Sequence, residues 1–164
     1  QSLAAGVTAF VGQNMGAGRE DRVRQGVRAA VLAADGWTVF TAVILCFFAE
    51  SFIGIFSPDA LVIAAGADYL RCVMPPYLLF ATLFVLNAAM RGAGDSVFPM
   101  LNVAASLILI RVPAVYLLAD HFGPHVMFWG YGIGWVSGCA LSVWYYVTGR
   151  WKRRFRAPEK REGQ

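Results

Sequence analysis

Long apolar stretches alternate along this chain with short polar gaps, and the charges in the gaps follow a pattern. Every one of the 14 Lys and Arg residues except Arg71 and Arg111 lies at 19–28, at Arg91 or in the tail 150–161. The intervening gaps, 50–66 and 119–125, contain acids and histidines but no Lys or Arg. Membrane proteins concentrate Lys and Arg in their cytoplasmic loops. The pattern predicts a multi-pass protein of the cell (inner or plasma) membrane, with its basic gaps and carboxy terminus in the cytoplasm.

The composition supports this interpretation. Hydrophobic residues make up 58% of the 164 residues and charged residues 15%, which leaves more apolar surface than a soluble domain of this size buries. The net charge of +4 lies beside the apolar stretches, where anionic lipid headgroups are the natural counter-charge. We therefore expect membrane lipid as a partner and exclude nucleic acid.

The apolar stretches predict an all-α transmembrane bundle. A helix needs about 20 residues to cross the hydrocarbon layer. The stretches 27–49, 67–90, 98–118 and 126–147 are long enough, whereas 2–15 is short. We expect the chain to be the carboxy-terminal part of a longer protein that is cut inside a transmembrane helix. Residues 2–15 would then be a partial helix. Residues 1–148 would form the membrane part and 149–164 a basic cytoplasmic tail.

Local signals add detail at the ends and within the third span. Ser57 and Pro58 begin a turn, which predicts a short amphipathic helix over 59–66 on the outer interface. Pro75 and Pro76 predict a kink in 67–90. In the tail, Trp151 and Phe155 are expected to lie against the inner leaflet. Cysteines, at 46, 72 and 139, lack a CxxC motif and are interpreted as small core residues.

Two glycine-rich runs end helices before cytoplasmic gaps: Val11-Gly-Gln-Asn-Met-Gly-Ala-Gly-Arg19 and Met90-Arg-Gly-Ala-Gly-Asp95, the second followed by Phe98-Pro-Met100. Close-set glycines let helix ends turn sharply and let backbones approach. Polar side chains in the runs can bond carbonyls left free at helix ends. A structural role is favoured over substrate contact because the runs lie near the cytoplasmic face. The residues assigned this role, with Arg111 and Pro113 added, are Gly12, Gln13, Asn14, Gly16, Gly18, Arg91, Gly92, Gly94 and Asp95.

These two runs and Arg111-Val-Pro113 resemble, in order and spacing, motifs of the multidrug and toxic compound extrusion (MATE) family. The resemblance implies twelve helices in two pseudo-symmetric lobes with both termini cytoplasmic. This chain would be the eighth helix, in part, through the twelfth, which makes it a partial second lobe. Its partner would be the missing amino-terminal lobe of the same protein.

Charges inside the apolar stretches need an account, because a charge in the bilayer is costly. Arg71 follows Asp68 by three residues, a spacing that favours a helical ion pair. Asp35 is an acid deep in a span and is our candidate for ion coupling, since an antiporter needs a carboxylate whose occupancy changes. Depth suggests a pair between Asp35 and Arg111. A polar cavity or a pair with Arg28 remains equally open.

The third span has a stripe at helical spacing formed by Tyr77, Phe80, Phe84, Asn87 and Arg91, of which the first four are the candidate substrate-binding residues. Such a face is suited to flat organic cations, although ordinary helix packing has the same pattern. The stretch 77–87 contains no carboxylate, and the resemblance would then place coupling acids in the missing lobe. In the fourth span, Asn102 and Ser106 share a face and are expected to make interhelical hydrogen bonds.

The chain has no pattern typical of an enzyme. Residues 120–125 hold two His and one Asp, but Gly123 and Pro124 make this segment a turn, and we predict no metal site. No nucleophile with a nearby base and no phosphate loop is present in the sequence.

We therefore expect a secondary antiporter that exports organic cations, drugs or toxins. We expect no cofactor, and an H⁺ or Na⁺ gradient would drive the transport. A flippase for lipid-linked precursors is the alternative if the complete cleft is strongly basic. An intramembrane enzyme or a non-transporting scaffold is the competing class.

Overall fold

The computed structural model describes residues 2–122 and 129–153, and all regular structure in these ranges is helical. The long elements are α2 (Glu20–Phe47), α4 (Ala60–Gly92) and α7 (Trp129–Val147). A fourth rod consists of α5 (Val97–Ala104), the π-helical segment η1 (Ala105–Ile110) and α6 (Arg111–Phe122). The remaining elements are α1 (Ser2–Gly16), α3 (Ala49–Gly54) and the 3₁₀ turn η3 (Arg150–Arg153). The prediction of an all-α bundle is confirmed.

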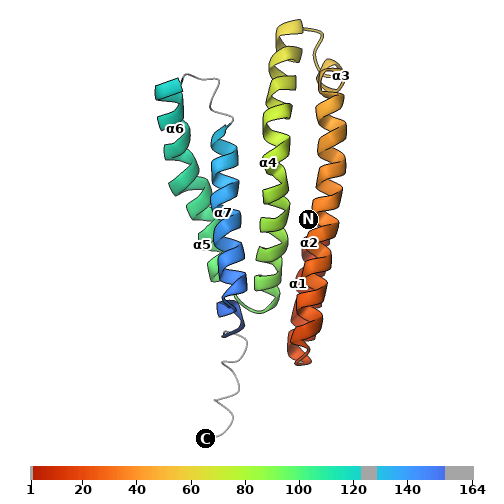
Figure 1. Ribbon diagram of the computed structural model, residues 1–164, viewed down its shortest axis with the longest axis vertical. Helices are drawn as coiled ribbons and strands as arrows, with labels where there is room; N and C mark the ends of the chain where they lie inside the picture. The colour runs from red at the N-terminus through yellow and green to blue at the C-terminus, as the bar shows by residue number, and fades with distance from the viewer. Residues whose placement is uncertain (1, 123–128, 154–164) are drawn as a thin grey trace, which may run out of the picture.

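The long helices run side by side, with α4 between α2 and α7 (Figure 1). The α5–η1–α6 rod packs on α7, on the side away from α2. Helix α1 packs in the angle between α2 and α4, and α3 lies against α4. This order decides which side chains can meet, because residues of α6 are separated from α2 by two helices.

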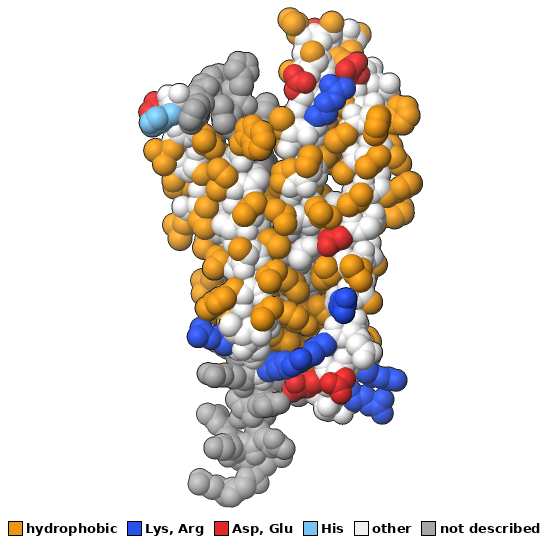
Figure 2. All heavy atoms as spheres, viewed as in Figure 1, with side chains coloured by type: hydrophobic (Ala, Val, Ile, Leu, Met, Phe, Trp, Pro, Cys, Tyr) orange, Lys and Arg blue, Asp and Glu red, His pale blue; other side chains and the backbone are white. Residues whose placement is uncertain are grey.

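Three of the described helical rods are long and apolar enough to cross a membrane: Glu20–Phe47, Ala60–Gly92 and Val97–His121. Hydrophobic side chains cover the middle of the visible face, while most charged side chains lie toward its ends (Figure 2). Helix α7 is not in this set, since Gly, Ser, Trp and Tyr lower its mean hydropathy. It nevertheless lies parallel to the spans and in contact with two of them.

The two ends of the bundle differ in charge (Figure 2). At one end, α1 turns into α2, α4 turns into α5, and α7 leads into η3. We call it the basic end because it carries Arg19, Arg22, Arg24, Arg28, Arg91, Arg150 and Lys152. The other end, called the far end, carries α3, the start of α4 and the last turn of α6.

The main hydrophobic core lies toward the basic end, where α1, α2 and α4 meet. The buried side chains of this core are Val7, Val11, Met15, Val23, Val27, Val85, Leu86, Ala88, Ala89, Met90, Ala93 and Trp151. Large side chains toward the far end are mostly exposed, such as Phe47, Phe56 and Leu61. Of the cysteines, Cys139 is buried as expected, Cys46 is half-buried, and Cys72 is exposed, which contradicts a core role for it.

The prediction that Trp151 lies against the inner leaflet is wrong. Its side chain is only 1% exposed, its ring stacks on Tyr146, and its Nε1 donates to the Tyr146 carbonyl at 2.9 Å. The chain reverses at Gly149, whose φ of 68° is left-handed, and this turn directs Trp151 back onto the bundle. Phe155 lies outside the described residues.

Several helix boundaries differ from those expected. Helix α2 begins at Glu20 rather than 27, because a helix continues beyond its apolar stretch and acids in its first turn complement the helix dipole. The separate helix predicted over 59–66 is wrong. These residues form the first turns of α4, and the Asp59 carboxylate caps the helix by accepting from the Leu61 amide at 2.8 Å. Helix α4 then continues through Pro75 and Pro76 without interruption.

Candidate transport site

The aromatic stripe expected on the third span is part of a ring cluster between α4 and α7. Tyr77, Phe80 and Phe84 follow one another along α4, with ring centroids 5.0 and 4.5 Å apart. Trp135 of α7 meets the Tyr77 ring edge-on at 5.3 Å and lies 5.5 Å from Phe80. Tyr77 and Phe84 remain 38% and 37% exposed, whereas Trp135 is buried. The cluster therefore packs two helices together and still presents ring surface at its edge.

Asn87, the fourth residue of the predicted stripe, is buried and takes part in a polar network. Its Oδ1 accepts from the Ser142 hydroxyl of α7 at 2.9 Å. Ser142 in turn accepts from Asn102 Nδ2 at 2.8 Å, and the same amide group donates to the Gly138 carbonyl at 3.0 Å. Ser106 donates to Asn102 Oδ1 at 3.4 Å. The network joins α4, α7, α5 and η1. It confirms the interhelical bonding expected for Asn102, whereas Ser106 bonds Asn102 within its own helical rod.

The carboxylate of Asp35 is held by Thr82 and not by an arginine. The Thr82 hydroxyl lies 3.0 and 3.1 Å from the two carboxylate oxygens, bridging α2 and α4. Asp35 is half-buried, and no ion pair links it to Arg111 or Arg28 in the described part of the chain. The Arg111 pairing is wrong because depth alone does not tell which helix faces which. Arg111 begins α6, which packs on α7 rather than on α2.

The two glycine-rich runs form the same helix-ending turn. At the end of α1, the Gly18 amide donates to Met15 O at 3.0 Å and the Arg19 amide to Asn14 O at 2.8 Å. At the end of α4, Gly94 donates to Arg91 O at 2.9 Å and Asp95 to Met90 O at 3.0 Å. Gly18 and Gly94 have φ of 69° and 87°. These are Schellman turns, in which a left-handed glycine satisfies the last carbonyls of the helix.

The side chains of these runs act differently from the prediction. Backbone amides, not side chains, satisfy the helix-end carbonyls. The Gln13 side chain is exposed, and Asn14 Nδ2 donates to Phe10 O within its own helix at 2.8 Å. Asp95 is an acceptor: its buried carboxylate bonds the Phe98 amide at 3.3 Å and the Tyr145 hydroxyl at 2.6 Å. Asp95 thus connects the end of α4, the start of α5 and α7.

Gly12 and Gly92 also allow α1 and α4 to approach. A methyl group added at Gly92 would lie 2.5 Å from the Thr8 carbonyl oxygen and 2.9 Å from Val11 Cβ. One added at Gly12 would lie 3.3 Å from the Gly92 carbonyl oxygen. The Thr8 hydroxyl donates across this contact to the Ala88 carbonyl at 3.1 Å. Gly16 has no neighbour within 4 Å of an added methyl group, so no packing role is visible for it.

Helix α7 carries a small-residue stripe that the sequence analysis missed. Added methyl groups at Gly134 and Gly138 would meet Arg111 Cβ at 3.2 Å and Ser106 Oγ at 2.8 Å. With Ser142, these glycines repeat every four residues and face the α5–η1–α6 rod. Small residues at this spacing are typical of close membrane-helix contacts. The i, i+4 pattern in the sequence was the available signal.

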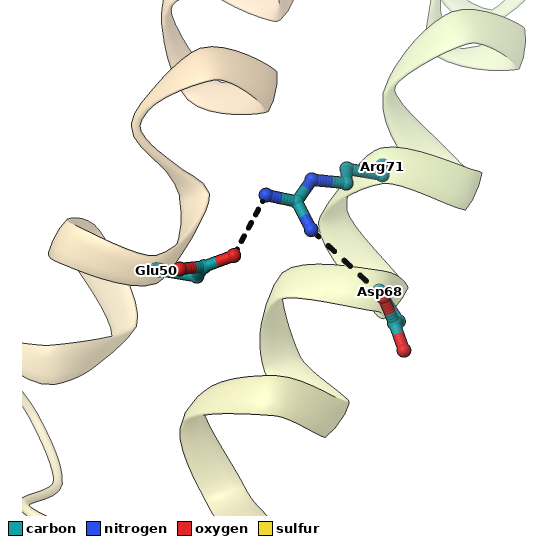
Figure 3. Close-up of polar contacts among 3 residues, drawn as sticks. All are labelled: Glu50, Asp68 and Arg71. Carbon is teal, nitrogen blue, oxygen red and sulfur yellow. Dashed lines mark hydrogen bonds and ion pairs between the residues drawn. The ribbon is translucent and has the colours of Figure 1, made fainter. Parts of the chain in front are cut away.

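At the far end, Arg71 makes the predicted ion pair with Asp68 at 4.0 Å and a second with Glu50 of α3 at 3.0 Å (Figure 3). All three side chains are exposed, so the cluster contributes little to stability. Nearby, the Asp120 to His125 segment extends beyond the described residues. Within 2–122 and 129–153, no three metal-binding side chains lie together.

Comparison with known proteins identifies the family. The MatE family model matches residues 1–117. The chain belongs to the MatE family. It is 29% identical over 153 residues to the probable multidrug resistance protein YpnP of Bacillus subtilis, covering 92% of this chain and 34% of that protein. It is 32% identical over 167 residues to the probable multidrug resistance protein NorM of Mesorhizobium japonicum, covering 94% and 33%.

A third relative, the multidrug resistance protein PmpM of Pseudomonas aeruginosa, is 29% identical over 162 residues, with 94% of this chain and 33% of that protein covered. This MatE chain thus spans about a third of the length of the curated relatives it matches. No solved structure matches it significantly.

Proposed function

We propose that this MatE chain forms part of the second lobe of a multidrug efflux antiporter, which exports organic cations in exchange for H⁺ or Na⁺. The observation that carries the proposal is the family match over 1–117. The names of the relatives, which describe multidrug resistance proteins, support it. We expect the basic end to face the cytoplasm, because proteins of the cell (inner or plasma) membrane concentrate Lys and Arg on that side.

In this proposal, the ring cluster of α4 and α7 is the part of the cleft wall that this chain contributes. The exposed edges of Tyr77 and Phe84 offer π-surface to a flat cation. Trp135 and Phe80 fix the orientation of these rings from behind. The amino-terminal lobe would supply the opposite wall. An aromatic rather than basic face favours organic cations over the anionic headgroups of lipid-linked precursors.

Transport by the complete protein containing this chain tests the proposal. Expressed in a pump-deficient bacterium, it should lower the accumulation of a cationic dye such as ethidium. Phe84→Ala should reduce dye efflux about two- to thirtyfold, which corresponds to one lost cation–π contact. The matched control is Phe47→Ala, an exposed aromatic at the end of α2. The absence of dye efflux under both an H⁺ and an Na⁺ gradient, with good expression, would overturn the proposal.

Asp35 is the coupling candidate within this proposal. Its carboxylate is half-buried in a span, where a charge is costly and proton or cation uptake relieves the cost. The Thr82 hydroxyl donates to this carboxylate and fixes its position between α2 and α4. Asp35→Asn should leave dye binding intact and remove the dependence of efflux on the ion gradient. Asp68→Asn is the control, and gradient-dependent efflux retained in Asp35→Asn would exclude Asp35 from coupling.

A further inference from the structure

A groove opens at the basic end between α2 and α7, with α4 as its floor. Its volume is about 640 Å³, within the range of about 300–1,000 Å³ typical of small-molecule sites. Arg24, Arg28 and Lys152 line the groove together with Val31, Val143 and Val147. The rings of the candidate transport site, Tyr77, Phe80 and Phe84, do not line it. The groove is therefore a separate site on another face of α4.

Two arginines on the rim of this groove have no ion-pair partner among the described residues. Arg24 and Arg28 are exposed, one turn apart on α2, and neither guanidinium has an ion-pair partner in the part of the chain that the structure describes. Lys152, by contrast, pairs with Glu20. Two positive charges thus remain available for an anion. An organic cation would be repelled.

A buried donor inside the groove also lacks an acceptor. Tyr146 lines the groove, and its hydroxyl oxygen is buried with no hydrogen-bond partner among the described residues. Arg24 lies close enough to this phenol for the two to interact electrostatically. An unmade hydrogen bond at a buried hydroxyl is costly, and an oxygen from a bound molecule would remove the cost.

The groove is amphipathic along its length. Its charged residues lie in the first turns of α2 and after the end of α7, whereas Val31 lies just under one turn beyond Arg28 and Val143 about one turn before the end of α7. A free anion needs only the charged rim, and an uncharged hydrocarbon needs only the apolar depth. A molecule with an anionic head and a hydrocarbon chain uses both, and the surrounding bilayer supplies it.

We propose that this groove binds one anionic phospholipid from the leaflet at the basic end. Its phosphate lies between Arg24 and Arg28, a headgroup or ester oxygen accepts from the Tyr146 hydroxyl, and one acyl chain runs along Val31, Val143 and Val147. The site does not include the ring cluster proposed for the transported substrate, although Thr82, the hydroxyl partner of Asp35, also lines the groove. It holds whether or not the proposed efflux activity is correct.

Native mass spectrometry of the complete protein containing this chain, titrated with phosphatidylglycerol, tests the proposal. The unmodified protein should bind phosphatidylglycerol more tightly than phosphatidylcholine. The double variant R24Q/R28Q should lower phosphatidylglycerol affinity about thirtyfold, at roughly a fivefold loss per cationic contact. The matched control is R19Q/R22Q, which removes two charges from the same end but none from the groove. It should bind like the unmodified protein.

A second variant separates the groove from general surface charge. Val143→Trp fills the apolar part while both arginines remain, and it should abolish tight binding of phosphatidylglycerol. The proposal would be overturned if R24Q/R28Q and R19Q/R22Q lost the same phosphatidylglycerol affinity, or if the unmodified protein bound both lipids equally. Inorganic phosphate that binds as tightly as phosphatidylglycerol, or unchanged phosphatidylglycerol binding in Val143→Trp, would also overturn it. Cross-linking of a cysteine at Val147 to another segment of the same protein would overturn it as well, because that segment and not a lipid would then cover the groove.

Discussion

Gly92 is the residue at which the contact between α1 and α4 leaves no room for a side chain. We predict that Gly92→Ala lowers the free energy of unfolding by about 1–3 kcal/mol, because the added methyl group overlaps the Thr8 carbonyl oxygen and Val11. The change is measured as the melting temperature of the purified protein in detergent.

The control for this prediction is Gly36→Ala, within α2. Nothing lies within 4 Å of a methyl group at Gly36, so this change should be neutral or slightly stabilising. If both variants melted at the same temperature, the tight crossing at Gly92 would be excluded.

Asp95 and Tyr145 form a second site at which single residues decide stability. A hydrogen bond from a hydroxyl to a charged acceptor contributes about 1.5–3 kcal/mol. We predict a coupling energy of this size in a double-mutant cycle of Asp95→Ala and Tyr145→Phe, since the 2.6 Å bond exists only when both groups are present. The cycle is measured from thermal or denaturant unfolding.

The comparison cycle pairs Tyr145→Phe with Asp68→Asn at the far end. These two changes should be additive because the residues share no contact. Additivity in the Asp95 cycle as well would show that the bond contributes nothing.

At this scale, sequence reasoning succeeded where helical spacing alone determines the contact. Arg71 and Asp68 are three residues apart on one helix, and their predicted ion pair is present. It failed for Asp35, whose partner Thr82 is on another helix. Depth along a helix gives a height in the membrane but not a direction around the axis, and the direction depends on tertiary packing.

Among the elements, the packing of α4, α5 and α7 depends on the buried network centred on Ser142. We predict that Ser142→Ala lowers the free energy of unfolding by about 1–3 kcal/mol, because Asn87 Oδ1 and Asn102 Nδ2 lose a buried partner. Differential scanning fluorimetry in detergent measures the effect.

Ser137→Ala is the matched control on the same helix. Its hydroxyl bonds only the Gly134 carbonyl within α7, so its loss should change stability by a few tenths of a kcal/mol. Equal effects of the two substitutions would contradict an interhelical role for Ser142.

The helices themselves were predictable because apolar runs of sufficient length have few alternatives in a bilayer. The residues at which the helices begin and end were harder to predict. Charged residues extended α2 back to Glu20, and α4 absorbed a segment expected to be a separate helix. The π-helical turn at 105–110 depends on the bond from the Arg111 amide to the Ser106 carbonyl, which no residue pattern indicates.

For the molecule as a whole, the separation of charge predicts its orientation. We expect a cysteine introduced at Gln25 to react with a membrane-impermeant maleimide only from the cytoplasm, and one at Asp59 only from outside, because Lys and Arg are retained inside. The background requires replacement of Cys46, Cys72 and Cys139, which are free thiols. Labelling of Asp59→Cys from the cytoplasm alone would reverse the assignment.

Burial is uneven along α4, and this has a mechanical consequence. Residues 85–90 are buried among α1, α2 and α7, whereas most side chains in its first turns are exposed or half-buried. Pro75 and Pro76 lie between these two parts and remove two amide donors from the helix. The first turns of α4 pack on α3 and lie outside the core. Moving them together with α3 would therefore leave the core intact, while displacing residues 85–90 would disrupt it. Any bending of α4 should pivot about its basic end.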